Sequence, residues 1–142
     1  MSMRKALQFM VLFFAFAAGT AFAADTIKVV YHFSEGLEQA SRGLNNIKNH
    51  LAAEPGVKIV AVAHGQGINF LVEGAEDKNK NPYNINVEDL AAKGVEFRVC
   101  NNTLTAYKID KSKLLPQATI VPAGVAEIAK LQAKEGYAYL KP

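Results

Sequence analysis

Short apolar runs alternate with amphipathic segments along most of the chain. Residues 26–33 (TIKVVYHF) are rich in β-branched and aromatic side chains and predict a first strand. Residues 57–63 (VKIVAVA) form a nearly continuous apolar run, which is typical of a strand covered on both faces by helices. Alternating apolar residues predict a third strand over 95–99. Residues 119–122 predict a fourth strand, and residues 137–140 predict a last one at the edge of a sheet.

Between these strands, apolar residues recur at helical spacing. The longest such segment, residues 37–51, predicts an amphipathic helix that ends before Glu54-Pro55-Gly56. Shorter helical segments are predicted over residues 68–73, 87–93, 103–109 and 125–134, with a further turn over 111–115. Alternation of strands and helices predicts a single α/β domain, a three-layer sandwich with a mostly parallel sheet. Sites in such sheets lie beyond the carboxyl ends of the strands.

Residues 75–86 interrupt this alternation with a polar stretch. Its composition predicts a solvated, mobile loop. The alternative is a lid or a subunit contact anchored by Tyr83. Tyr83, Tyr137 and Tyr139 are candidates for exposed subunit contacts, although hydrophobic filling would explain these aromatic residues as well.

The first 23 residues have the pattern of a secretory signal peptide. Arg4 and Lys5 precede an apolar run over residues 6–18, and Ala21-Phe22-Ala23 supplies the small residues of a cleavage site. The run is shorter than the roughly 20 residues of a membrane span, so cleavage is favoured over an uncleaved anchor. We therefore expect a signal peptide over 1–23 and a domain over 24–142. The protein would be periplasmic or otherwise exported, with no membrane attachment after cleavage.

Charge and cysteine content narrow the function further. The 142 residues include 16 basic and 13 acidic side chains, and removing the signal peptide with its two basic residues leaves 14 against 13. Such a balance gives no indication of nucleic-acid binding. The one cysteine, Cys100, has no partner for an internal disulfide. In an exported protein it would pair between molecules, fill the core as an inert thiol, or remain free and reactive.

Cys100 is the sharpest candidate for chemistry. It follows the strand predicted over 95–99 and precedes Asn101, Asn102 and Thr103, residue types that cap helices. A cysteine beside a helix N-terminus is favoured as thiolate, the reactive form. A small hydrophobic residue filling the edge of the sheet would fit the pattern equally well.

Two histidines are also predicted at strand ends. His32 ends the first strand and His64 follows the second, where His64 could donate to a thiolate or sulfur acceptor or only satisfy local backbone groups. His32, His64 and Cys100 together would suit copper or zinc, but they lack the paired spacing of known metal motifs. His50 is expected on the surface of the first helix. Nucleotide-binding fingerprints, paired catalytic carboxylates and a nucleophilic serine elbow are not identifiable.

Three segments resemble the DsrE/DsrF-like family, and the resemblance covers essentially the whole chain after the signal peptide. They are VKIVAVAHGQGINFLVEGAE, NPYNINVEDLAAKGVEFRVCNNTL and LLPQATIVPAGVAEIAKLQAKEGYAYLKP. Val-Cys-Asn-Asn-Thr-Leu is the most specific piece, because the family keeps a cysteine at a strand end. The resemblance implies an α/β sandwich assembled as trimers or hexamers. It also implies that sulfur-relay members carry sulfane sulfur as a persulfide on the residue that matches Cys100.

A persulfide carrier needs a lone, accessible sulfur of low pKa, and the lack of a second cysteine meets the first requirement. We therefore expect an exported, self-associating protein that binds or relays sulfur through Cys100 without a cofactor, with a protein as sulfur donor or acceptor. His64, Asn101, Asn102 and Thr103 would stabilise the anionic sulfur, as backbone N–H groups do at a helix start. The alternatives are a metal- or small-ligand-binding module and a non-catalytic scaffold with an inert cysteine.

Overall fold

A computed structural model describes residues 25–142, and the predicted signal peptide lies outside these described residues. Its five strands form one sheet in the order β4-β3-β2-β1-β5, and every neighbouring pair is parallel. The strands are β1 (Lys28–Phe33), β2 (Lys58–Ala63), β3 (Glu96–Cys100), β4 (Ala118–Val121) and β5 (Ala138–Leu140). The predicted parallel sheet is therefore confirmed, and the last strand lies at an edge as expected.

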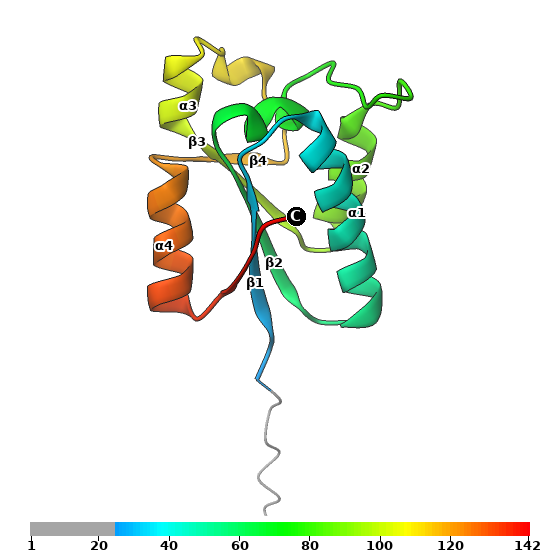
Figure 1. Cartoon of the computed structure of the whole chain (residues 1–142), viewed down its shortest axis with the longest axis vertical. Coiled ribbons are helices and arrows are strands. Elements are labelled where there is room, and N and C mark those ends of the chain that lie inside the picture. The colour runs from blue at the N-terminus through cyan, green and yellow to red at the C-terminus, as the bar shows by residue number, and fades with distance from the viewer. Residues whose placement is uncertain (1–24) are drawn as a thin grey trace, which may run out of the picture.

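Helices cover the sheet on both sides. They are α1 (Leu37–Ala53), the 3₁₀ helix η1 (Gly65–Leu71), α2 (Tyr83–Ala92), α3 (Asn101–Ala106), the 3₁₀ turn η2 (Lys111–Lys113) and α4 (Gly124–Glu135). Figure 1 shows α1 and α2 on one side of the sheet and α4 on the other, with α3 beyond one end of the strands. The predicted three-layer α/β fold is thus confirmed. No helix among residues 25–142 has the length and apolar character needed to cross a bilayer.

The two faces of the sheet bury cores of different size. The larger core lies under α1, η1 and α2 and includes Phe33, Phe70 and Phe97, whose rings pack against one another. The smaller core lies under α4 and consists of Val30, Val60, Val62, Ile128 and Leu131. Successive side chains of a strand point to opposite faces, so β1 and β2 contribute to both cores. This double burial explains why β2 is apolar at nearly every position.

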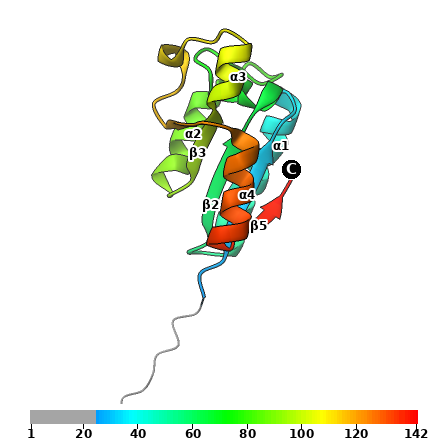
Figure 2. The same cartoon turned by 90° about the vertical axis from the view of Figure 1, so that its left-hand side faces the viewer.

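The path of the chain brings its two ends together. Strands β1 to β4 follow one another across the sheet, and the connection after β4 then runs back so that β5 lies on the far side of β1. Helix α4 makes this return and lies in front of the sheet in Figure 2. Because of this return, β1 has β2 as its neighbour on one side and β5 on the other, and its side chains can contact those of both strands.

The segment between η1 and α2 differs from the prediction. Most side chains between residues 76 and 81 are exposed, as expected of a solvated loop. However, helix α2 begins at Tyr83 rather than at residue 87, and Tyr83 is only 2% exposed. The Tyr83 hydroxyl donates to the carbonyl of Leu37 at 2.8 Å and accepts from Ser41 Oγ at 2.7 Å. The expectation of an exposed contact at Tyr83 is therefore wrong, because its ring joins the core and its hydroxyl ties α2 to α1.

Candidate functional site

His32, His64 and Cys100 meet at the carboxyl edge of the sheet, on the face that α4 covers. His32 lies two residues after Val30 in β1, and His64 two residues after Val62 of β2, so both point to the α4 side. Ala63 pairs with Val99, which places His64 and Cys100 next to each other one step further along the two strands. The three residues predicted at strand ends are thus on one edge of one face.

Gly124, the first residue of α4, lies between His64 and Cys100. A Cβ at position 124 would come within 3.1 Å of the Cβ of His64 and 3.3 Å of the Cβ of Cys100. Both distances are shorter than ordinary van der Waals contact. Glycine therefore allows the start of α4 to approach the sulfur closely.

The Cys100 sulfur is buried yet surrounded by hydrogen-bond donors. The residue is 5% exposed, and burial, the largest single influence, acts to raise the pKa of its thiol. The N–H of Gly124, the hydroxyl and N–H of Thr103 and the N–H of Asn102 act against burial. Their combined effect lowers the pKa of Cys100 below its usual value, because donors stabilise an anion more than a neutral thiol.

Thr103 links the sulfur to the turn after β2. Its hydroxyl oxygen accepts a hydrogen bond from the N–H of Gly65 at 2.9 Å, which leaves the hydroxyl proton free to point to Cys100. Thr103 is 8% exposed and holds this geometry from inside α3. This hydrogen bond joins the start of η1 to α3 next to the cysteine.

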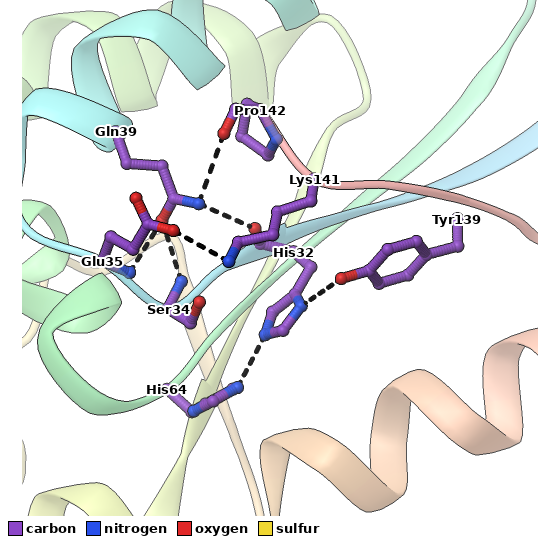
Figure 3. Close-up of polar contacts among 8 residues, drawn as sticks. All are labelled: His32, Ser34, Glu35, Gln39, His64, Tyr139, Lys141 and Pro142. Carbon is purple, nitrogen blue, oxygen red and sulfur yellow. Dashed lines mark hydrogen bonds and ion pairs between the residues drawn. The ribbon is translucent and has the colours of Figure 1, made fainter.

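The two histidines form a directly hydrogen-bonded pair. Nε2 of His32 lies 2.6 Å from Nε2 of His64, and the rings stack with centroids 4.8 Å apart. The other nitrogen of His32, Nδ1, lies 2.6 Å from the hydroxyl of Tyr139 in β5. Figure 3 shows this row of side chains, with the second ring nitrogen of His64 on the side away from His32. Tyr139 is 41% exposed, so the row begins at the surface.

Burial and nearby positive charge keep the pair neutral. Burial is the main reason that the pKa of each histidine is lowered. The charge of Lys141 lowers both pKa values further, and His64 does the same to His32, while Glu35 acts in the opposite direction on His32. Neutral imidazoles can each be both donor and acceptor, which the contact between them requires.

Buried Gln39 fixes the turn that follows His32. Its side-chain oxygen accepts from the N–H groups of Ser34 and Glu35 at 2.9 and 2.8 Å, and it is 1% exposed. Its amide nitrogen donates to the carbonyl of His32 at 3.5 Å and to that of Pro142 at 3.4 Å (Figure 3). Lys141 pairs with Glu35 at 2.8 Å. The C-terminal segment is thereby joined to the end of β1.

An ion-pair cluster attaches α4 to the sheet beside the site. Arg98 of β3 donates to Glu127 of α4, and its other nitrogen donates to Glu96 at 2.6 Å. Arg98 is two residues before Cys100 and on the same face of the sheet. The position of α4, and with it Gly124, therefore depends on a contact next to the cysteine.

Comparison with known proteins identifies the family of the chain. The sequence profile of the DsrE/DsrF-like family matches residues 15–142. The chain belongs to the DsrE/DsrF-like family. A solved structure from Methanobacterium thermoautotrophicum, MTH1491, described as a protein of unknown function, is 32% identical with a TM-score of 0.73. The similarity covers 82% of this chain and 99% of MTH1491.

The ychN protein from E. coli has a similar fold. It is 14% identical with a TM-score of 0.66, over 84% of this chain and 100% of ychN. A search of curated proteins gave no significant match. The DsrE-like α/β fold expected from sequence is thus established, whereas MTH1491, being of unknown function, suggests no activity for this chain.

Asn102 and Thr103 provide N–H groups, and the hydroxyl of Thr103 adds another donor. No side chain caps α3 by a hydrogen bond, because Cys100 itself occupies the N-cap position. The side-chain oxygen of Asn101 is buried without a hydrogen-bond partner among the described residues. His64 lies beside the site, but its Nε2 is used by His32.

Sequence patterns did not identify Gly124, Tyr139 or Lys141 as part of the site. Each lies in the C-terminal third of the chain and reaches the site only through the return of α4 and β5. The stretch VPAGVAE, within the third segment that resembles the family, is the signal that could have pointed to Gly124. Nothing in the sequence indicated that Tyr139 would lie beside His32.

The alternative of a metal centre is not supported by the geometry. Among residues 25–142, no three or more histidine, cysteine or acidic side chains are grouped closely enough to hold a metal ion. Two cavities, of about 190 and 590 Å³, lie next to Tyr83 at α1. Neither is lined by Cys100, His32 or His64, so the edge site is separate from them.

Proposed function

We propose that the protein binds or relays sulfane sulfur as a persulfide on Cys100. The observation that carries the proposal is the group of N–H and O–H donors around a sulfur whose pKa is lowered in spite of burial. A lone thiolate with fixed donors can accept sulfur without forming an internal disulfide. Family membership supports the same chemistry, since sulfur relay occurs among DsrE-like proteins.

The proposed steps need no external oxidant. The Cys100 thiolate attacks the outer sulfur of a donor persulfide, R–S–SH, so that one S–S bond forms as the donor's S–S bond breaks. The products are the Cys100 persulfide and the donor thiolate, R–S⁻. In the return step an acceptor thiolate attacks the outer sulfur, and Cys100 leaves as thiolate. Atoms, charge and oxidation state balance in both directions.

Burial favours one rival function. Because Cys100 is 5% exposed, it could be an inert core residue in a scaffold protein. The rival and the proposal differ in what the sulfur does in the native state. An inert thiol stays unmodified until the protein unfolds, whereas a carrier takes up sulfur while folded.

Intact mass spectrometry tests the proposal. The wild-type protein and a Cys100→Ser variant are exposed to polysulfide under native conditions and then analysed with and without reductant. We expect wild-type protein to gain about 32 Da, one sulfur atom, which reductant removes and which the variant never shows. Normal folding of Cys100→Ser, checked by circular dichroism, makes its lack of an adduct meaningful. No gain on the folded wild type would favour the scaffold.

We further propose that the protein is exported and works as a homo-oligomer, a trimer or hexamer, with a second protein as sulfur donor or acceptor. The sequence of residues 1–23 supports export. Exposed Val125 on α4 and Ile85 on α2 offer apolar surface for self-association away from Tyr139. N-terminal sequencing of cell-fractionated protein and light scattering test the two points. An uncleaved N-terminus or a stable monomer would contradict them.

A further inference from the structure

The row of Tyr139, His32 and His64 has a property that neither histidine has alone. A hydrogen bond needs one donor and one acceptor, so only one proton lies between the two Nε2 atoms, 2.6 Å apart. Two neutral imidazoles hold two ring protons in total. The second proton must therefore sit on one of the outer nitrogens, Nδ1 of His32 or Nδ1 of His64.

The two possible arrangements differ only in the positions of protons. In one, His64 carries its proton on Nδ1, and the bare Nδ1 of His32 accepts from the Tyr139 hydroxyl. In the other, His64 has given up that proton and holds the shared one, while Nδ1 of His32 carries a proton towards the Tyr139 oxygen. Passing between them releases one proton at His64 and takes up one at Tyr139. No heavy atom has to move.

The two ends of the row lie in different surroundings. Tyr139 is on edge strand β5 and is 41% exposed, so its hydroxyl can exchange protons with water. His64 packs against Gly124 through its Cβ and Cδ2, and Gly124 also lies against the Cβ of Cys100. A donor whose outer sulfur reaches Cys100 would therefore have its leaving sulfur within a short distance of the His64 ring. In Figure 3 Nδ1 of His64, on the ring edge opposite Cδ2, points away from His32 and from Tyr139.

We propose that Tyr139, His32 and His64 form a proton path that supplies a proton to the thiolate leaving the sulfur donor. The inference rests on the proposed persulfide function. When Cys100 takes the outer sulfur of R–S–SH, the donor departs as R–S⁻, and His64 Nδ1–H gives it a proton to form R–SH. The shared proton moves to His64, His32 takes a proton from Tyr139, and water restores Tyr139. The return step runs the path backwards, taking the proton from the acceptor thiol.

The charged groups around the row suit a neutral path. Lys141 follows β5, Glu35 lies in the turn after β1, and the two form an ion pair at 2.8 Å. Cys100 on β3 and Tyr139 on β5 lie at the same edge, and the hydroxyl of Tyr107 lies near Gly65, the residue after His64. The positive charge of Lys141 disfavours a positive charge on either imidazole. The histidine pair therefore transfers protons without holding an extra one.

The path makes a prediction that separates sulfur transfer from simple cysteine reactivity. Alkylation of Cys100 by iodoacetamide releases iodide, which needs no proton, and so reports only thiolate content and access. Sulfur uptake from a low-molecular-weight thiol persulfide releases a thiolate, and this thiolate needs a proton. Substitutions in the proton path should slow sulfur uptake and leave alkylation nearly unchanged.

The test compares both rates at neutral pH for Tyr139→Phe, His32→Asn and His64→Asn. Tyr139→Phe removes only an exposed hydroxyl, so folding should be unaffected. We expect the rate of sulfur uptake to fall roughly tenfold in His64→Asn and by less in Tyr139→Phe. These decreases are small for acid–base groups because a thiolate is a good leaving group even without a proton. Alkylation should remain within about twofold of wild type.

Matched controls come from outside the row. His50→Asn changes a histidine that contacts the Tyr31 hydroxyl on the other side of the sheet, and Tyr137→Phe changes a tyrosine just before β5. Neither should alter either rate. A solvent isotope effect on sulfur uptake in wild type, reduced in Tyr139→Phe, would support proton transfer along the row.

The outcomes distinguish the two proposals. Sulfur uptake by wild type with unchanged rates in all three path variants would overturn the proton path and leave the carrier function intact. Equal losses of uptake and alkylation would mean that the histidines only shape the pocket, which also overturns the path. A folded wild-type protein that takes up no sulfur would overturn both proposals.

Discussion

The backbone of Gly124 lies against Cys100, so close that a Cβ on Gly124 would come within 3.3 Å of the cysteine Cβ. The same contact brings the first N–H of α4 to the sulfur, where it lowers the pKa of the thiol. Thiolate stabilisation therefore depends on how α4 is placed on the sheet. A residue remote in sequence from Cys100 sets the chemistry of the cysteine.

Gly124→Ala should weaken this stabilisation. The added methyl would meet His64 and Cys100 at 3.1 and 3.3 Å, so the start of α4 must move away from the sulfur. We expect the pKa of Cys100 to rise and the free energy of unfolding to fall by about 1–3 kcal/mol, as for other overpacked sites. The rate of alkylation measured against pH would report the pKa, and urea unfolding the stability.

Gly36→Ala is the matched control for that substitution. A Cβ at position 36 would have only an ordinary contact of 3.6 Å with the side-chain oxygen of Gln66. The rate of Cys100 alkylation measured against pH should be the same in Gly36→Ala as in wild type. If Gly124→Ala also matched wild type, the N–H of Gly124 would not be what lowers the pKa of Cys100.

Thr103→Val should remove a second stabilising group at nearly constant volume. The valine could neither accept from the N–H of Gly65 nor donate to the sulfur. We expect a higher pKa for Cys100 and a loss of about 1–3 kcal/mol in stability, because the buried N–H loses its partner. Thr105→Val, on the exposed side of the same helix, is the comparison, and alkylation profiles of the two should differ clearly.

Stability should decrease as the pH falls below the usual histidine pKa near 6.5. The pKa values of His32 and His64 are lowered in the folded protein, mainly by burial. Between that usual value and the lowered ones the unfolded chain binds more protons than the native state, so protonation favours unfolding. Urea unfolding at pH 7.5 and 5.5 would measure the difference.

The double variant His32→Asn/His64→Asn isolates the histidine contribution to this pH dependence. Asparagine does not titrate, so the loss of stability between pH 7.5 and 5.5 should become smaller than in wild type. Glu35, Asp77 and Asp110, whose pKa values are also lowered, affect stability at more acidic pH. An unchanged pH dependence in the double variant would show that other groups cause it.

Tyr83→Phe should affect stability and not sulfur chemistry. The substitution removes the hydroxyl that donates to Leu37 and accepts from Ser41, two contacts that join α2 to α1. We expect a loss of about 1 kcal/mol in urea unfolding, the usual net value of such hydrogen bonds. Sulfur uptake should equal wild type, because Tyr83 lies on the opposite side of the sheet from α4. Reduced uptake would connect the cavities beside Tyr83 to the Cys100 site.

Local patterns predicted the elements well, because each strand and helix has its own periodicity. The continuous apolar run of residues 57–63 predicted a strand buried on both faces, and β2 is buried in that way. Tyr83 shows where such patterns fail. It lies among charged and amide side chains that resemble a loop, and only packing against Phe70 and α1 makes it the first residue of a helix.

The candidate site could be predicted only as far as strand order allowed. Cys100, His32 and His64 were placed at strand ends by sequence, and parallel strands bring such ends to one edge. That His32 and His64 hydrogen bond follows from β1 pairing with β2, which the sequence does not specify. Gly124 and Tyr139 reach the edge through the reversal of direction after β4, a feature of topology rather than of any local pattern.

The return of α4 and β5 to β1 also has a consequence for folding kinetics. Pairs such as Val30 and Tyr139 join the first and last strands, and contacts so distant in sequence form slowly because a long loop must close. Until they form, Cys100 lacks the N–H of Gly124, and His32 lacks the hydroxyl of Tyr139. Before α4 docks, only the donors of Thr103 and Asn102 can act on the sulfur, so we expect the pKa of Cys100 to reach its lowered value only when the last elements have docked.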